Sequence, residues 1–280
     1  MPSEVFPAPL STEPVPQEKW NPLAGQDQSL VAVAAVASYA AAWWIGRWTR
    51  VPAEPGFDPS VTGQPSVVLA VLVTAVVVGV GGLIAAVLVG RHRPEAAVFG
   101  AACGLAALSY RGGTMTNVLH DAASTGVFVR LVVETLILTT LLLATWFAIG
   151  RRKAVPSEAA DDGGNAMLAT ATATVIAGVL AYLLVPVDVK LQAMGGVFFA
   201  GLIGAWTAYA VFPARGAMWY WLAVPLVGVI GYALAWFQPG QYMVGMTDQP
   251  LAHPIPLDYC GIGVAGAILG YWSGRKRDGE

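Results

Sequence analysis

The chain has 280 residues, of which 56% are hydrophobic and only 11% are charged, and its mean hydropathy is +0.62. Soluble domains carry about 25% charged residues, so this composition indicates an integral membrane protein. A formal net charge of −2, with the basic residues scattered along the chain, argues against a nucleic-acid partner, which needs a basic stripe to follow the phosphates. Two cysteines are too few for a disulfide framework.

The first 28 residues are rich in proline and acidic side chains. They have neither a helical or strand periodicity nor enough apolar surface to fold alone, so we expect a disordered cytoplasmic tail over 1–28. We do not expect a secretory signal there, because the first apolar run begins only near Leu30 and no short basic region leads into it.

Eight apolar stretches follow the tail, and a helix needs about 20 residues to cross a bilayer. They are predicted at 29–48, 66–90, 95–114, 126–150, 166–185, 191–212, 217–237 and 258–273. The predicted fold is therefore all-α: a polytopic integral membrane domain over 29–273, followed by a basic and polar cytoplasmic tail at 274–280. An alternative remains for the first stretch, which could lie in the interface instead of crossing.

Basic residues predict the orientation, because cytoplasmic loops carry the excess of Lys and Arg. With both termini inside, ten basic residues lie on the inner side and four on the outer side, and Arg130 lies at the membrane edge. The outer four are Arg47, Arg50, Arg111 and Lys190. The inner ten are Lys19, Arg91, Arg93, Arg151, Arg152, Lys153, Arg215, Arg275, Lys276 and Arg277. We expect a multi-pass protein of the bacterial cytoplasmic (inner) membrane, with the lipid bilayer as its surroundings.

Glu134 is the only carboxylate well inside a predicted span. Counting twenty residues back from Gly150 places it about three residues, or roughly 5 Å, inside the outer boundary. A charge at that depth needs a partner, and Arg130 on the same helix and Arg111 on the adjacent one are available. We expect an ion pair with Arg111, because Arg130 can extend outward to the interface. The alternative role for Glu134 is to handle a proton or a substrate in an aqueous vestibule.

A second group of polar residues falls around the predicted external loops, namely His120, Asp121, Asp248, His253 and Asp258. Histidines and carboxylates can bind a divalent metal or act as acid and base. No two of them have a metal-ligand spacing such as HxxxH or HExxH, and loop histidines are usually solvated, so we expect neither a metal nor a cofactor. The chain also has no Walker A, GxSxG, GxGxxG or CxxCH signature.

Glycines recur every four residues in the last predicted span, at Gly266, Gly270 and Gly274. Such a strip lets another helix approach closely. We expect this strip to pack within the bundle, and the alternative is a partner helix or a second copy of the chain. The two halves of the chain show no internal repeat of the kind typical of many secondary transporters.

These patterns predict a non-enzymatic multi-pass membrane protein, either a small permease or an accessory subunit that packs against a partner. Eight spans are more than an anchor needs, which slightly favours transport. The alternative is an integral-membrane enzyme that uses the external His and Asp residues. A permease needs a cavity near the middle of the membrane that reaches Glu134, whereas an enzyme needs His120 and His253 close to a common point.

Overall fold

The structure, a computed structural model, describes residues 25–49, 60–64, 66–89, 93–120, 125–150, 163–214, 216–238, 242–243 and 246–277. Nearly all of them are helical. Among these residues, six helices are long and apolar enough to cross a membrane. They are α1 (Gly25–Thr49), α2 (Val67–Val89), α5 (Gly126–Gly150), α6 (Gly163–Leu184), α7 (Lys190–Val211), and α8 (Met218–Trp221) with α9 (Ala223–Phe237) as one segment.

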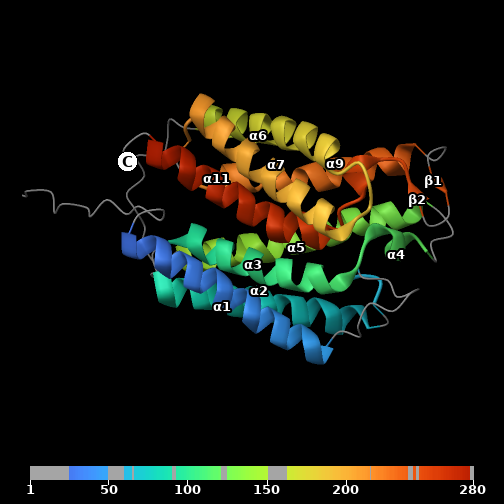
Figure 1. Ribbon diagram of the computed structural model, residues 1–280, viewed down its shortest axis with the longest axis horizontal. Helices are drawn as coiled ribbons and strands as arrows, with labels where there is room; N and C mark the ends of the chain where they lie inside the picture. Colours follow the sequence, from blue (N-terminus) through green and yellow to red (C-terminus); the bar gives the residue numbers. More distant parts are fainter. Residues whose placement is uncertain are drawn as a thin grey trace, which may run out of the picture.

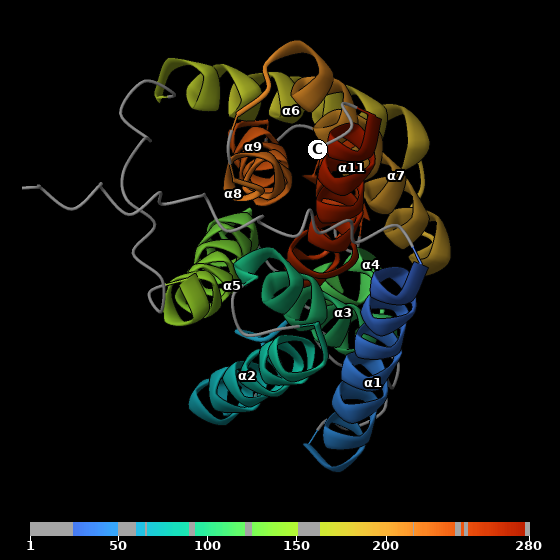
Figure 2. The same cartoon turned by 90° about the vertical axis from the view of Figure 1, so that its left-hand side faces the viewer.

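Two further helical segments lie in the middle of the bundle. The first is α3 (Pro94–Gly112), and the second is the continuous run of α10 (Pro256–Asp258), η4 (Tyr259–Gly263) and α11 (Val264–Arg277). Seen end-on, α3 and α11 are surrounded by the six apolar segments (Figure 2). Most residues of both central segments are buried. Both segments are rich in alanine and glycine, which suits helices that face protein on all sides.

The outer helices separate their side chains by size. On α6 the buried face is a row of alanines (Ala166, Ala169, Ala173, Ala177 and Ala181), and the exposed face carries Leu168, Val175, Val179 and Leu183. Small residues toward the protein and large apolar residues outward are typical of helices that pack closely inside a bilayer. The structure therefore supports an α-helical membrane protein.

Close backbone approach fixes how the central helices pack. A Cβ atom at Gly100 of α3 would lie 2.5 Å from the carbonyl oxygen of Gly81 on α2. On α11, a Cβ atom at Gly266 or Gly270 would overlap a backbone carbonyl of α7. The glycine strip of α11 is thus occupied by α7 within the chain, as expected, and a partner helix would have to use another surface.

The ends of the long helices gather at two opposite ends of the bundle (Figure 1). One end, here called the loop end, carries α4 (Met115–Leu119), the strands β1 (Tyr242–Met243) and β2 (Met246–Thr247), and the 3-10 helix η3 (Pro250–Ala252). The two strands form an antiparallel pair, with Met243 opposite Met246. The opposite end, here called the basic end, carries the start of α3 and the end of α11.

Helix boundaries depart from several of the predicted spans, and α6, for example, begins at Gly163 and not at 166. α3 ends at Gly112 and not at 114, because Gly113 has a φ of 95°, a left-handed conformation that stops the helix. The last helical run begins at Pro256 and continues to Arg277, well into the predicted tail. At the other end α1 begins at Gly25, inside the predicted disordered segment, of which residues 1–24 lie outside the described part.

Candidate functional site

A buried ion pair joins three helices at the loop end. The Nζ atom of Lys190, the first residue of α7, lies 2.8 Å from Oδ1 of Asp258 on α10 and 2.8 Å from Oγ of Ser109 on α3. The Ser109 hydroxyl also donates to Asp258 Oδ1. The side chain of Asp258 is 1% exposed and that of Lys190 15% exposed. Each of the three polar groups is therefore satisfied by the other two inside the protein.

The second oxygen of Asp258 fixes the start of the central helix. Oδ2 accepts a hydrogen bond from the backbone N–H of Ile255, at 2.9 Å, in the capping arrangement of a helix N-terminus. Asp258, predicted to belong to an external polar cluster, is folded into the start of the helix and buried against Lys190, so it is not exposed on a loop.

Next to this pair the loop end holds a cavity of about 310 Å³. Three segments form its wall: α4, the turn between α6 and α7, and the segment from β2 to His253. The lining residues are Met115, Thr116, Leu119, Pro186, Val187, Asp188, Thr247, Asp248 and His253. Lys190 and Asp258 follow closely along the same two segments, so the ion pair holds together the chain that builds the cavity.

Asp188 is oriented by the helix it faces. Its carboxylate accepts hydrogen bonds from the backbone N–H groups of Met115 and Thr116 and from the Thr116 hydroxyl, the last at 2.6 Å. These donors are the free N–H groups of the first turn of α4. The bonds fix the position of a carboxylate that lines the cavity.

His253 is buried and connects two other segments. Its Nδ1 lies 3.0 Å from the carbonyl oxygen of Val185, and its Nε2 lies 2.9 Å from the carbonyl oxygen of Thr247. A carbonyl only accepts, so the neutral ring can donate to one of the two, and the imidazolium donates to both. The expectation of a solvated loop histidine is wrong, because the return of the chain through η3 places this ring in the cavity wall with 7% exposure.

The other members of the predicted external cluster are only partly brought together. Asp248 is exposed and lines the cavity beside His253. His120, at the end of α4, is exposed and is not among the lining residues, and Asp121 lies outside the described residues. Within the described part of the chain, no group of three or more His, Cys, Asp or Glu residues is arranged to hold a metal ion.

Glu134 is buried on α5 and fastens a loop. Its Oε2 accepts hydrogen bonds from the backbone N–H and the hydroxyl of Thr62, at 3.0 and 2.8 Å. Thr62 belongs to the segment 60–64 that precedes α2, so the carboxylate ties this connection to α5. Arg130 lies one turn earlier on α5 and is partly buried.

The expected ion pair between Glu134 and Arg111 is not formed between these two described side chains. Arg111 donates from Nη1 to the carbonyl oxygen of Trp43 at 3.1 Å, and its guanidinium lies 4.9 Å from the centre of the Trp43 ring. The physical reason is the rotation of α3, which turns Arg111 toward α1 and not toward α5. A cation–π contact with an aromatic residue near a helix end replaces the carboxylate partner.

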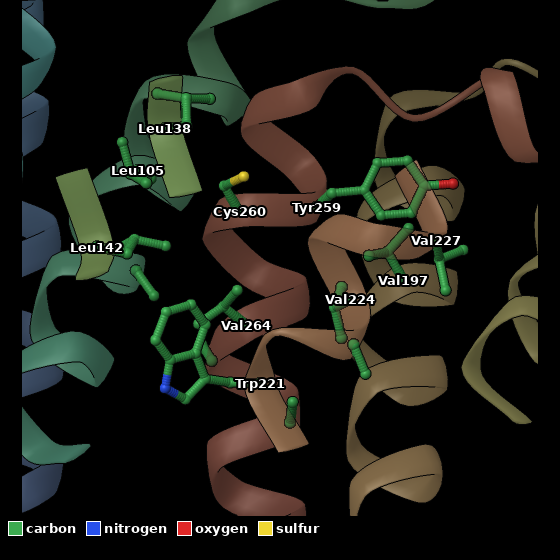
Figure 3. Close-up of a cluster of buried hydrophobic side chains, with 14 of the residues drawn as sticks. Leu105, Leu138, Leu142, Val197, Trp221, Val224, Val227, Tyr259, Cys260 and Val264 are labelled. Carbon is green, nitrogen blue, oxygen red and sulfur yellow. The ribbon is translucent and has the colours of Figure 1, made fainter. Parts of the chain in front are cut away.

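The π-helical turn η4 places two side chains on opposite sides of the central helix. Cys260 lies on the side of Leu105 and Leu138, from α3 and α5, whereas Tyr259 lies on the side of Val197 and Val227, from α7 and α9 (Figure 3). Tyr259 also donates its hydroxyl to the carbonyl oxygen of Leu251, at 2.7 Å. Single π-helical turns occur often at functional positions, and this one packs between helices of the first and second halves of the chain.

Sequence reasoning missed Ser109 and Asp188, and it used Lys190 only as an orientation signal. A usable signal existed for the ion pair, since Lys190 and Asp258 each stand at the outer edge of a predicted span. The chain matches no protein-family model, and comparisons with curated proteins and with solved structures give no match.

Proposed function

We propose that the chain is a non-enzymatic accessory subunit of the cytoplasmic membrane that crosses the bilayer eight times with both termini inside. The observation that carries the proposal is that its buried charged side chains bind other parts of the same chain. Glu134 holds a loop through Thr62, and Asp258 holds α3, α7 and α10 together through Ser109 and Lys190. Charged groups inside a membrane domain are functional by default, but these are engaged in holding helices and loops to one another. The large apolar outer faces then remain as the surface for a partner.

The distribution of the helices supports eight crossings. The six apolar segments surround α3 and the α10–α11 run, and a central helix of 19 to 22 residues has the length to cross with them. The basic end lies on the cytoplasmic side in this proposal, because Arg93 and Arg275 belong to it. The loop end with its cavity then faces outward.

Cysteine labelling tests the orientation. In a background with Cys103→Ala and Cys260→Ala, single cysteines replace Asp248 at the loop end and Lys276 at the basic end, two exposed positions. A membrane-impermeant maleimide added to intact cells should label the first variant and not the second. Lysed cells, in which both should react, provide the control. Labelling of both variants in intact cells would refute the orientation.

Photo-crosslinking in native membranes tests the accessory role. A photoreactive amino acid is placed at one exposed position of each outer segment: Val36, Leu72, Leu136, Val179, Phe199 and Ile230. We expect a discrete adduct with one other polypeptide, confined to neighbouring segments. The same amino acid at the buried Ala173 on the opposite face of α6 is the control and should react only within the chain. Adducts to lipid alone at all six positions would contradict the accessory role.

Transport remains as a second candidate function because a polar cavity stands open at the loop end. A permease would use this cavity as its outer vestibule, although Glu134 is not among the cavity's lining residues. Purified protein alone in sealed vesicles should then accumulate a solute, whereas an accessory subunit alone should not. The enzyme alternative would need His120 and His253 close to a common point, and of the two only His253 lines the cavity.

A further inference from the structure

The cavity at the loop end has the size and the wall of a binding site. Its volume of about 310 Å³ lies at the lower end of the range for small-molecule pockets. It occurs in a molecule whose helices elsewhere approach to backbone contact, as at Gly81 and Gly100. Three segments distant in sequence converge on it, and the buried His253 closes one side.

The charge of the lining side chains indicates that the ligand of this cavity is a cation. Asp188 and Asp248 both line the cavity, and among the lining residues that the structure describes there is neither Lys nor Arg. Even with both ring nitrogens of His253 carrying a proton, these described side chains sum to a negative charge. Asp188 is held in place by the first turn of α4, so its position requires no rearrangement when a cation binds.

The remaining lining residues indicate an organic cation and not a metal ion. Both ring nitrogens of His253 already face backbone carbonyls, so the ring is not placed to coordinate a metal. Met115, Leu119, Pro186 and Val187 give the cavity an apolar side that suits an alkyl chain. Thr116 and Thr247 supply neutral polar groups at its border.

We propose that this cavity binds a small aliphatic amine, with its ammonium group toward Asp188 and Asp248 and its alkyl part against α4 and the 186–187 turn. This site does not depend on the accessory role, because it rests on the lining residues alone. It would serve equally as a sensor site of a subunit or as the entrance of a carrier. The proposal assigns one class of ligand, small aliphatic amines, to the loop end.

A matched series of probes tests the charge requirement in purified full-length protein. Binding of n-pentylammonium, n-pentanol and pentanoate, which share one alkyl chain, is measured by calorimetry at constant ionic strength. We expect saturable binding of the ammonium compound and at least tenfold weaker binding of the other two. Equal binding of the alcohol, tighter binding of pentanoate, or binding of Ca²⁺ in place of the amine would overturn the proposal.

Two variants locate the site. Asp248→Asn changes an exposed side chain and should raise the dissociation constant of the amine about tenfold without changing the unfolding temperature. Asp27→Asn, near the start of α1, removes the same charge elsewhere and should leave binding unchanged. Unchanged affinity in a folded Asp248→Asn protein, or an equal loss in both variants, would place the binding outside this cavity. Asp188→Asn is avoided because it removes the cap of α4.

Discussion

The ammonium group of Lys190 and the carboxylate of Asp258 lie 2.8 Å apart although 68 residues separate them in the chain. They fasten the start of α7 to the start of the central helix, and the Ser109 hydroxyl brings α3 into the same contact. One buried interaction therefore sets the spacing of three helices at the loop end.

Removal of either partner leaves the other charge, which is buried for Asp258 and partly buried for Lys190, without compensation. Asp258→Asn and Lys190→Met should each lower the free energy of unfolding by about 3 to 5 kcal/mol. The double variant should cost less than the sum, because it leaves no isolated charge. Thermal unfolding in detergent measures all three proteins. Strictly additive losses would mean that the two side chains do not interact.

Glu134 and Arg111 have different partners, so their substitutions should be independent. Glu134→Gln weakens the charged hydrogen bonds from Thr62 and should cost about 1.5 to 3 kcal/mol. The loss in the double variant with Arg111→Ala should equal the sum of the two single losses to within about 0.5 kcal/mol. Thr62→Val, by contrast, should be strongly non-additive with Glu134→Gln. If the measured losses of Glu134→Gln and Arg111→Ala are not additive, the two side chains interact, as expected from the sequence.

The contact between α11 and α7 predicts a position-specific effect of one methyl group. Gly270→Ala would drive a Cβ atom into the Leu202 carbonyl, so we expect a loss of about 1 to 3 kcal/mol or more. Gly195→Ala on α7 is the matched control, since its added Cβ meets nothing within 4 Å. There alanine should be neutral or slightly stabilising, because it favours the helix. Equal unfolding temperatures for both variants would contradict the packing.

His253 should hold the segment of β2 and η3 against the end of α6. His253→Phe keeps an aromatic ring but donates nothing to the carbonyls of Val185 and Thr247. We expect faster amide hydrogen exchange across 247–253, together with a loss of about 1 to 3 kcal/mol in the free energy of unfolding, because a carbonyl that accepted from the ring loses its donor. His120→Phe, at an exposed position, is the control. Unchanged exchange in His253→Phe would show that the ring does not hold the segment.

The long apolar stretches were predictable because their signal is local. The residues 126–150 form α5 as expected, since a run of this length and apolarity has few alternatives to a helix. The partner of Arg111 was not predictable, because it depends on the rotation of α3 about its own axis, and α3 touches both α1 and α5. Burial of His253 and Asp258 likewise depends on how the chain folds back after α9. The spacing of residues in the sequence does not predict this fold.

The central place of α11 affects how the protein is made. α11 follows every other described helix in the chain, so the ribosome delivers it after its neighbours α3 and α7. Being glycine-rich and ending in basic residues, it has less tendency than the outer helices to enter lipid alone. In the proposed topology with eight crossings, α11 inserts between segments that are already in the membrane, and until then their close-packing faces stay uncovered. Final assembly of the bundle in the membrane therefore waits for translation to reach its last described helix.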